Sequence, residues 1–370
     1  MSARVFLLAA ALAACGQPVP SPGRDGRAQP QSFADMPVAR AAHGAVALPD
    51  GRVLLVGGCV LESCEAGPES AAVDAYDPRS GRIARAGALL ERRLSAVVVR
   101  LASGRILVAG GWSGPQVSAR VELWDPATGR SRGGPQLAAA RSDLAAATLA
   151  DGRVLLAGGF DGDGPVDLVE IFDPSRGKLI SAGRLTVARA GAGAAPLPDG
   201  RVLIVGGGTG TGAREPTASA EIFDPGTGRS VAVGALAAPR YKHATVVLPD
   251  GRVLVFGGSD RRDRNGKIDR VERFEPGIRG FVAAGRLLAP RYKIGGAVVR
   301  LPDGKVLIAG GAPRAERYDP QTGVSEFAGP DFGASLNFAS ATLLADGSVL
   351  VAGGYDEDGI RMSRKAWRLR

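Results

Sequence analysis

The chain has 370 residues, of which 54 are glycine and 25 proline, while aromatic residues make up only 5%. This balance favours many short strands joined by tight turns and argues against a fold of long helices. The formal net charge is +9, but the arginines are scattered singly, without the basic runs or interleaved aromatics typical of nucleic-acid sites. We therefore expect an all-β protein that binds no nucleic acid.

The N-terminus has the pattern of an export signal. Residues 1–14 contain an apolar stretch that is too short to span a bilayer. The letters LAACG at positions 12–16 are similar to the bacterial lipobox, in which the cysteine thiol is acylated. We expect Cys15 to be the lipidated N-terminus of an exported protein anchored to the bacterial cell envelope, and Gly16 favours the outer membrane. The alternative is an ordinary signal peptide cleaved near Ala14.

A folded domain follows a flexible segment. Residues 15–31 are rich in proline and glycine, a composition that reads as a tether because it builds no core. We place the domain at residues 32–370, where one unit recurs seven times. Each copy has an apolar run that closes on a Gly-Gly pair: Gly57-Gly58, Gly110-Gly111, Gly158-Gly159, Gly206-Gly207, Gly257-Gly258, Gly310-Gly311 and Gly353-Gly354.

Each copy has the sequence pattern of four consecutive strands. An Asp-Gly turn, as at Asp50-Gly51, precedes the Gly-Gly run and predicts a two-residue hairpin between two strands. A third strand ends in an aromatic-Asp-Pro phrase such as Tyr76-Asp77-Pro78, and Gly81 turns the chain into a fourth strand. A sheet of this size cannot bury both faces alone, so we expect the seven copies to stack radially as a seven-bladed β-propeller of four-stranded antiparallel blades.

Two further patterns support this prediction. The first strand of each unit is built from small residues, which suit the crowded position near the axis. The seventh unit stops after its third strand near Leu369, so we expect residues 31–37 to supply the missing strand and close the ring.

These residues resemble the Kelch repeat. The resemblance rests on an arginine before the first strand, the Gly-Gly run and the aromatic of the aromatic-Asp-Pro phrase, and it covers residues 34–370. One departure is the absence of the usual tryptophan in the fourth strand. The resemblance implies the fold and leaves function open, because Kelch propellers include oxidases, an epimerase and many binding modules.

Catalytic metal chemistry has little support in the sequence. Copper oxidases of the Kelch type use histidines and a Tyr-Cys pair, whereas this chain has only His43 and His243, at matching repeat positions that indicate structural roles. We expect no metal, no cofactor and no catalytic residues. Cys59 and Cys64 lie in one short loop, and an oxidising compartment favours a disulfide between them over free thiols.

The candidate ligand-binding residues begin with an arginine series. One arginine stands before the first strand of six units, and Leu336 interrupts the series in the seventh; the six are Arg40, Arg93, Arg141, Arg189, Arg240 and Arg291. At the rim of the propeller, their guanidiniums would bind carboxylates or sulfates in a bidentate manner. The alternative is a structural clamp to neighbouring blades and loop carbonyls.

Two adjacent units add aromatic and ammonium groups to this series. The phrases contribute Tyr241 and Lys242 in the fifth unit, and Tyr292 and Lys293 in the sixth. Such a combination favours stacking on a sugar or binding of an acidic chain. We regard these residues as the best single patch.

The sequence favours a binding module over an enzyme. We expect a monomer whose ligand is a protein or an acidic glycan and which meets the membrane only through its lipid anchor. One alternative is a carbohydrate-active enzyme such as a sialic-acid epimerase-like Kelch protein, for which Glu215, Asp143 and Lys242 are the better exposed polar groups, although none forms a recognisable pair. The other alternative is a structural component of the envelope.

Overall fold

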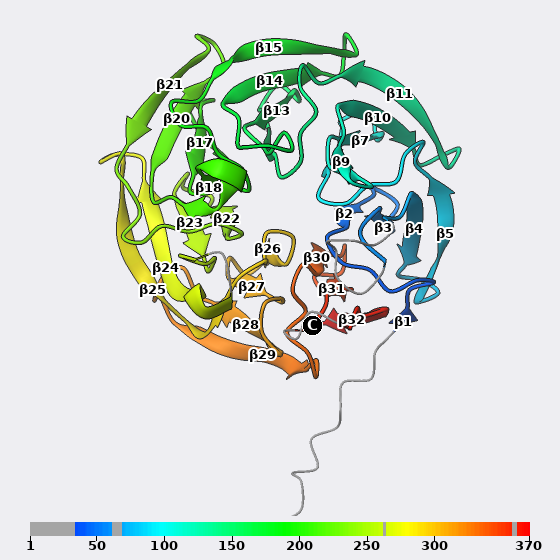
Figure 1. Ribbon diagram of the computed structural model, residues 1–370. Coiled ribbons are helices and arrows are strands. Elements are labelled where there is room, and N and C mark those ends of the chain that lie inside the picture. Colours follow the sequence, from blue (N-terminus) through cyan, green and yellow to red (C-terminus); the bar gives the residue numbers. More distant parts are fainter. Residues whose placement is uncertain (1–33, 61–68, 262–263, 357–360) are drawn as a thin grey trace, which may run out of the picture.

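The computed structural model describes residues 34–60, 69–261, 264–356 and 361–370. The predicted signal peptide at 1–14, the tether at 15–31, Cys15 and Cys64 all lie outside these ranges. Within them, seven four-stranded antiparallel sheets are arranged around a central axis, as predicted (Figure 1).

The blades follow one another in chain order. Blade 1 consists of β2 (Gly44–Ala47), β3 (Val53–Val56), β4 (Ala72–Asp77) and β5 (Arg82–Ala88). Blade 2 consists of β6 (Val97–Arg100), β7 (Ile106–Ala109), β10 (Arg120–Asp125) and β11 (Arg130–Gln136). Blade 3 consists of β12 (Ala145–Thr148), β13 (Val154–Ala157), β14 (Leu168–Asp173) and β15 (Lys178–Arg184). Blade 4 consists of β16 (Gly193–Pro196), β17 (Val202–Val205), β20 (Ala220–Asp224) and β21 (Arg229–Val233).

The remaining blades complete the ring. Blade 5 consists of β22 (Ala244–Val247), β23 (Val253–Phe256), β24 (Ile268–Glu275) and β25 (Gly280–Arg291). Blade 6 consists of β26 (Val298–Arg300), β27 (Val306–Ile308), β28 (Arg314–Tyr318) and β29 (Ser325–Asp331). Blade 7 consists of β30 (Ser340–Leu343), β31 (Val349–Ala352), β32 (Lys365–Leu369) and β1 (Ala34–Asp35).

The order of strands within a blade follows their side chains. The innermost strands, such as β2 and β16, are short and rich in glycine and alanine, which fit near the axis. The second strands, such as β13, are buried along their whole length. Gly110 directly follows β7, the second strand of blade 2, and has φ +64°. A Cβ at this position would lie 2.3 Å from the carbonyl oxygen of Arg141, which precedes blade 3. The Gly-Gly pair therefore permits a close approach between blades.

The apolar core lies between neighbouring blades. Phe223, the aromatic of the aromatic-Asp-Pro phrase in blade 4, is fully buried and belongs to one cluster with Leu155 and Ile171 of blade 3. Burying a side chain of this size contributes about 1.5–3 kcal/mol. Each blade thus depends on its neighbour for its core.

The N-terminal strand closes the ring. Ala34 pairs with Ala366, and the Met36 amide donates to the Arg364 carbonyl at 2.6 Å. The prediction that the N-terminal segment supplies the fourth strand of the seventh blade is confirmed.

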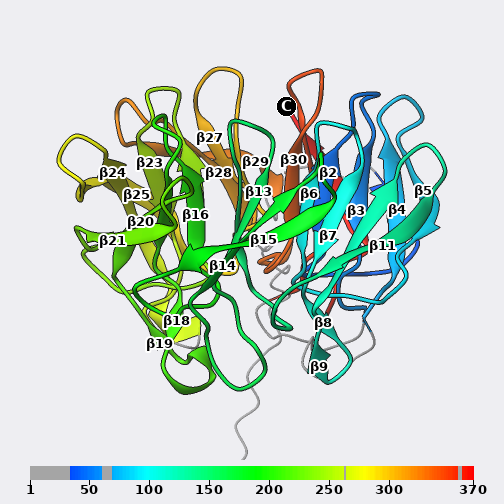
Figure 2. The same ribbon diagram turned by 90° about the horizontal axis from the view of Figure 1, so that it is seen from above.

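Loops that the repeat pattern did not predict extend one face of the disc. The hairpin of β8 (Trp112–Ser113) and β9 (Gln116–Val117) and that of β18 (Gly208–Thr209) and β19 (Glu215–Pro216) project from the same face (Figure 2). Short 3-10 turns at Thr211–Ala213 and Arg264–Gly266 are the helical elements of the described chain. Among these residues, no helix has the length and apolar character to cross a membrane.

Candidate functional site

The arginine series lies inside the blades. The Arg93 guanidinium donates at 3.0 Å to the Glu122 carboxylate of the third strand in its own blade, and both side chains are closed to solvent. All six arginines have such an acidic partner, in the pairs Arg40–Asp74, Arg93–Glu122, Arg141–Glu170, Arg189–Glu221, Arg240–Glu272 and Arg291–Glu316. Burial is the main cause that lowers the pKa of each of these arginines.

The five pairs that contain a glutamate also tie their blade to the preceding connection. Arg93 donates to the Gly110 carbonyl at 2.7 Å, while Glu122 accepts the amides of Leu90 and Glu91, which link blade 1 to blade 2. We therefore correct the expectation that the arginines meet a ligand at the rim. Their guanidiniums form ion pairs inside the propeller, and their side chains are only 0–1% exposed, so they clamp the blades together.

Blade 7 replaces the clamp with apolar packing. Leu336 stands at the arginine position, and the strand register places Trp367 where Asp74 stands in blade 1. Both residues are buried in one apolar cluster. The charged partners are exchanged together, so neither charge is left buried alone, which would be strongly unfavourable.

Seven residues two positions after the clamp form a ring around the axis, which we call the mouth ring. All seven have a left-handed backbone and line a central cavity of about 430 Å³; they are Ala42, Ser95, Asp143, Gly191, Lys242, Lys293 and Phe338. Hydrogen bonds run from blade to blade around it, as from the Lys293 amide to the Lys242 carbonyl at 2.9 Å. A left-handed backbone costs a non-glycine residue roughly 1–2 kcal/mol. Such strain is typical of functional sites.

The mouth ring gathers two ammonium groups over aromatic rings. Lys242 Nζ lies 5.3 Å and Lys293 Nζ 5.4 Å from the centroid of the Phe338 ring, which lies in blade 7. Lys293 Nζ also lies 2.5 Å from the Tyr355 hydroxyl. The structure thus brings together the predicted lysines of blades 5 and 6, and we call Lys242, Lys293, Phe338 and Tyr355 the lysine-aromatic cluster.

The two predicted tyrosines have a supporting position. Tyr241 and Tyr292 are each only 7% exposed. Lys242 Nζ lies 5.1 Å from the Tyr241 centroid, and Lys293 Nζ lies 4.8 Å from that of Tyr292. Their rings therefore hold the lysines by cation–π contacts more than they present a surface for stacking.

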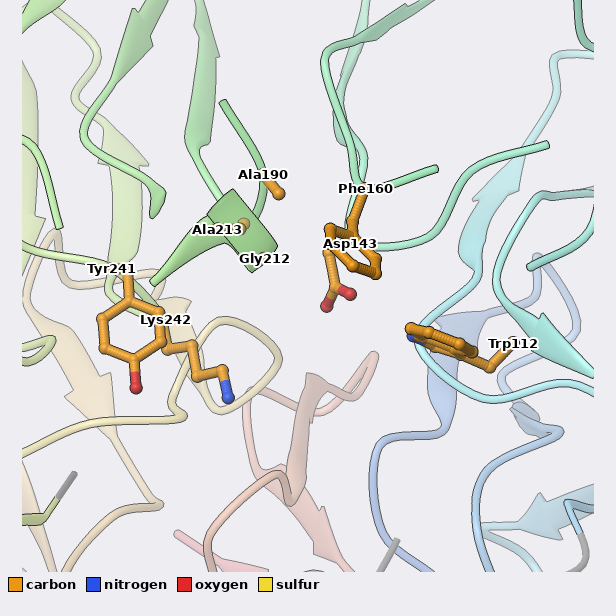
Figure 3. Close-up of a pocket in the computed structure, with 9 residues that line it drawn as sticks. Trp112, Asp143, Phe160, Ala190, Gly212, Ala213, Tyr241 and Lys242 are labelled. Atoms are coloured by element: carbon orange, nitrogen blue, oxygen red, sulfur yellow. The ribbon is translucent and has the colours of Figure 1, made fainter. Parts of the chain in front are cut away.

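A pocket of about 180 Å³ opens beside Lys242 on the face that carries the extra hairpins. Trp112 and Phe160 form one wall, with ring centroids 5.8 Å apart and planes tilted by 32°. Figure 3 shows the Asp143 carboxylate beside these rings and the Lys242 ammonium on the opposite side, both directed into the space between. Carboxylate, ammonium and aromatic groups thus converge on one small volume.

The described residues do not fit a catalytic copper site. Burial is the main cause that lowers the pKa of both His43 and His243 to about 3, and His43 Nε2 lies 2.9 Å from the Ser340 hydroxyl. Cys59, the described cysteine, is disulfide-bonded, while Cys64 lies outside the described ranges. Across those ranges, no three His, Cys, Asp or Glu side chains are grouped so as to hold a metal ion.

Comparisons with known proteins identify the fold class. A scan for protein families finds no match to this chain, and a search of curated proteins also finds none. Among solved structures, the chain is similar to a fungal alcohol oxidase of the AA5 family in complex with copper, with a TM-score of 0.73 and 18% identity. The match covers 90% of this chain and 74% of the oxidase. The protein is a seven-bladed β-propeller, the domain type also found in galactose-oxidase-like enzymes.

The strongest site residues beyond the predicted patch are aromatic. Trp112, Phe160 and Tyr355 each follow a Gly-Gly pair directly, in blades 2, 3 and 7. Phe338 occupies the same repeat position as Lys242. Superposing the seven copies residue by residue would have placed all four on the mouth from sequence alone.

Proposed function

We propose that this protein is an exported Kelch-type propeller, held to the cell envelope by a lipid on Cys15, whose mouth binds an acidic glycan. The observation that carries the proposal is the pair of ammonium groups, Lys242 and Lys293, that lie over the Phe338 ring beside the central cavity. Ammonium groups bind carboxylates and sulfates through charge-assisted hydrogen bonds, and aromatic rings offer apolar faces to sugar rings.

The strained backbone gives a second reason for this choice. The mouth-ring position accepts glycine in blade 4, as Gly191, yet it carries lysine in blades 5 and 6 at φ +54° and +58°. Glycine would adopt this conformation at no steric cost. We therefore attribute the presence of lysine at these positions to ligand binding by the side chains, which face the axis, and not to a preference of the backbone.

A binding screen of the full chain against acidic and neutral glycans tests the proposal. We expect saturable binding of an acidic glycan that weakens as salt rises from 50 to 500 mM, because screening acts on exposed charges. Lys242→Gln and Lys293→Gln should each raise Kd about tenfold or more, equivalent to ~1.4 kcal/mol.

Lys178→Gln provides the matched control, since Lys178 is an exposed lysine on the outer strand β15. It should leave Kd unchanged. If Kd is unchanged in both Lys242→Gln and Lys293→Gln, or is unchanged at high salt, the mouth is not the glycan site.

A further inference from the structure

The pocket beside Lys242 contains one carboxylate among its lining residues, that of Asp143. Among the described residues, Asp143 receives a side-chain hydrogen bond from the Ser142 hydroxyl at 2.9 Å, and no lysine or arginine nitrogen lies within ion-pair distance of it. The clamp carboxylates, by contrast, each face a guanidinium. Asp143 therefore differs from the acidic residues that hold the fold together.

Asp143 also faces an aromatic wall. It lines the pocket with Trp112 and Phe160, whose rings lie on the same side of the opening (Figure 3). A carboxylate attracts a cation by charge, and the face of a tryptophan attracts one through its quadrupole. These two groups together favour an ammonium group over a neutral hydroxyl.

Lys242 gives the opposite side of the pocket the opposite charge. Its ammonium belongs to the lysine-aromatic cluster and also lines the pocket. A ligand that spans both must carry an anion toward Lys242 and a cation toward Asp143. At about 180 Å³ the pocket is smaller than the ~300–1,000 Å³ of sites for drug-sized ligands, so it suits one sugar ring.

We propose that this pocket binds an ammonium-bearing sugar ring next to the anionic unit held by Lys242 and Lys293, so that the ligand is a zwitterionic glycan. This inference rests on the proposed function and names the substrate class of the same mouth. The ammonium donates to the Asp143 carboxylate and lies over Trp112.

Two disaccharides that differ only in the amine test the inference on the full chain. One is a hexuronic acid–glucosamine disaccharide with a free amine, and the other is its N-acetylated form. We expect the free-amine form to bind at least tenfold more tightly. Asp143→Asn, which retains size and tolerates a left-handed backbone, should abolish this preference. Asp163→Asn, an exposed loop carboxylate outside the pocket lining, should leave it unchanged.

The other variants separate the two proposals. Lys242→Gln should weaken both disaccharides and keep the preference between them, whereas Trp112→Ala should weaken the free-amine form more. Equal binding of both forms, or a preference that survives Asp143→Asn, overturns the zwitterionic ligand while Lys242→Gln still reports on the acidic-glycan site. If neither disaccharide binds and the glycan screen is insensitive to both lysines, the proposed function fails as well.

Discussion

Arg291 Nη2 and Glu316 Oε1 lie 2.7 Å apart, and neither side chain has any exposed surface. Glu316 also accepts the amides of Leu288 and Ala289. Glu316→Ala should lower the free energy of unfolding by about 3–5 kcal/mol, because it leaves a buried cation without a partner. Urea denaturation measures the change.

An exposed ion pair serves as the control for this clamp. Asp269 and Arg286 lie 2.9 Å apart with exposures of 36% and 64%, so Asp269→Ala should cost less than about 1 kcal/mol. Replacing both clamp partners, as Arg291→Leu with Glu316→Met, should recover much of the loss, following the apolar exchange in blade 7. Equal losses in the clamp and surface variants would contradict the argument.

The two histidines should make stability fall in mild acid. Burial lowers the pKa of His43 and His243 to about 3, below the ~6.5 of an unfolded chain. Between these values the unfolded state binds more protons, so the free energy of unfolding decreases as pH falls, with a slope that approaches about 1.4 kcal/mol per pH unit for each histidine near pH 5. Denaturation between pH 6.5 and 5 measures this slope, and His43→Gln should reduce it. An unchanged slope in that variant would show that His43 is not the titrating group.

Ring closure depends on Met36. Its side chain is fully buried in the cluster that joins blade 7 to blade 1. Met36→Ala should cost about 2–5 kcal/mol in urea denaturation, whereas Met36→Leu should cost less than about 1.5 kcal/mol. Val38, which is 40% exposed, gives a nearby control, since Val38→Ala should have little effect. A small loss in Met36→Ala would mean that the Met36 side chain contributes little to the closed ring.

The lysines of the mouth ring should lower the stability of the fold while they strengthen ligand binding. Lys242 has φ +54°, so Lys242→Gly should raise the free energy of unfolding by about 1 kcal/mol while it weakens the acidic glycan. Gly191→Ala should lower the free energy of unfolding, because alanine is strained at the φ of +61° that Gly191 adopts. An added Cβ would meet open space, so no steric clash adds to this backbone strain. Thermal unfolding and the glycan assay together measure both effects. A stability loss in Lys242→Gly would indicate that its cation–π contacts outweigh the backbone strain.

The lipid anchor can be tested directly in cells. Cys15→Ser should abolish incorporation of labelled fatty acid and move the protein from the membrane fraction to the soluble fraction, because no acyl chain can be attached. Cys64→Ser retains the lipobox cysteine and should leave labelling unchanged. Labelling that persists in Cys15→Ser would contradict the assignment.

The sequence predicted the blades because their determinants are local and repeated. Gly110 and the Asp-Gly turns report backbone shapes that few other residues adopt, and seven copies remove chance from the pattern. The structural role of the arginines was harder to predict, because the sequence around Arg93 is the same whether its side chain faces solvent or pairs with Glu122. An acid two residues before each aromatic, as in Glu122 before Trp124, carried the missing signal. The repeat positions of Trp112 and Phe160 place them at the mouth, but the loop that brings Gly212 and Ala213 to the pocket is not part of the repeat and could not be predicted from it.

The shared seventh blade has a consequence for biosynthesis. Its strands come from both ends of the chain, so a ribosome must release nearly the whole sequence before the last sheet can assemble. Any truncated product lacking β32 loses Ala366 from the apolar cluster that contains Val53 and Leu55 of blade 1. Chaperones and proteases recognise exposed apolar surfaces. The strand order therefore makes closure of the ring depend on a chain that contains both β1 and β32, because these two strands complete the seventh sheet.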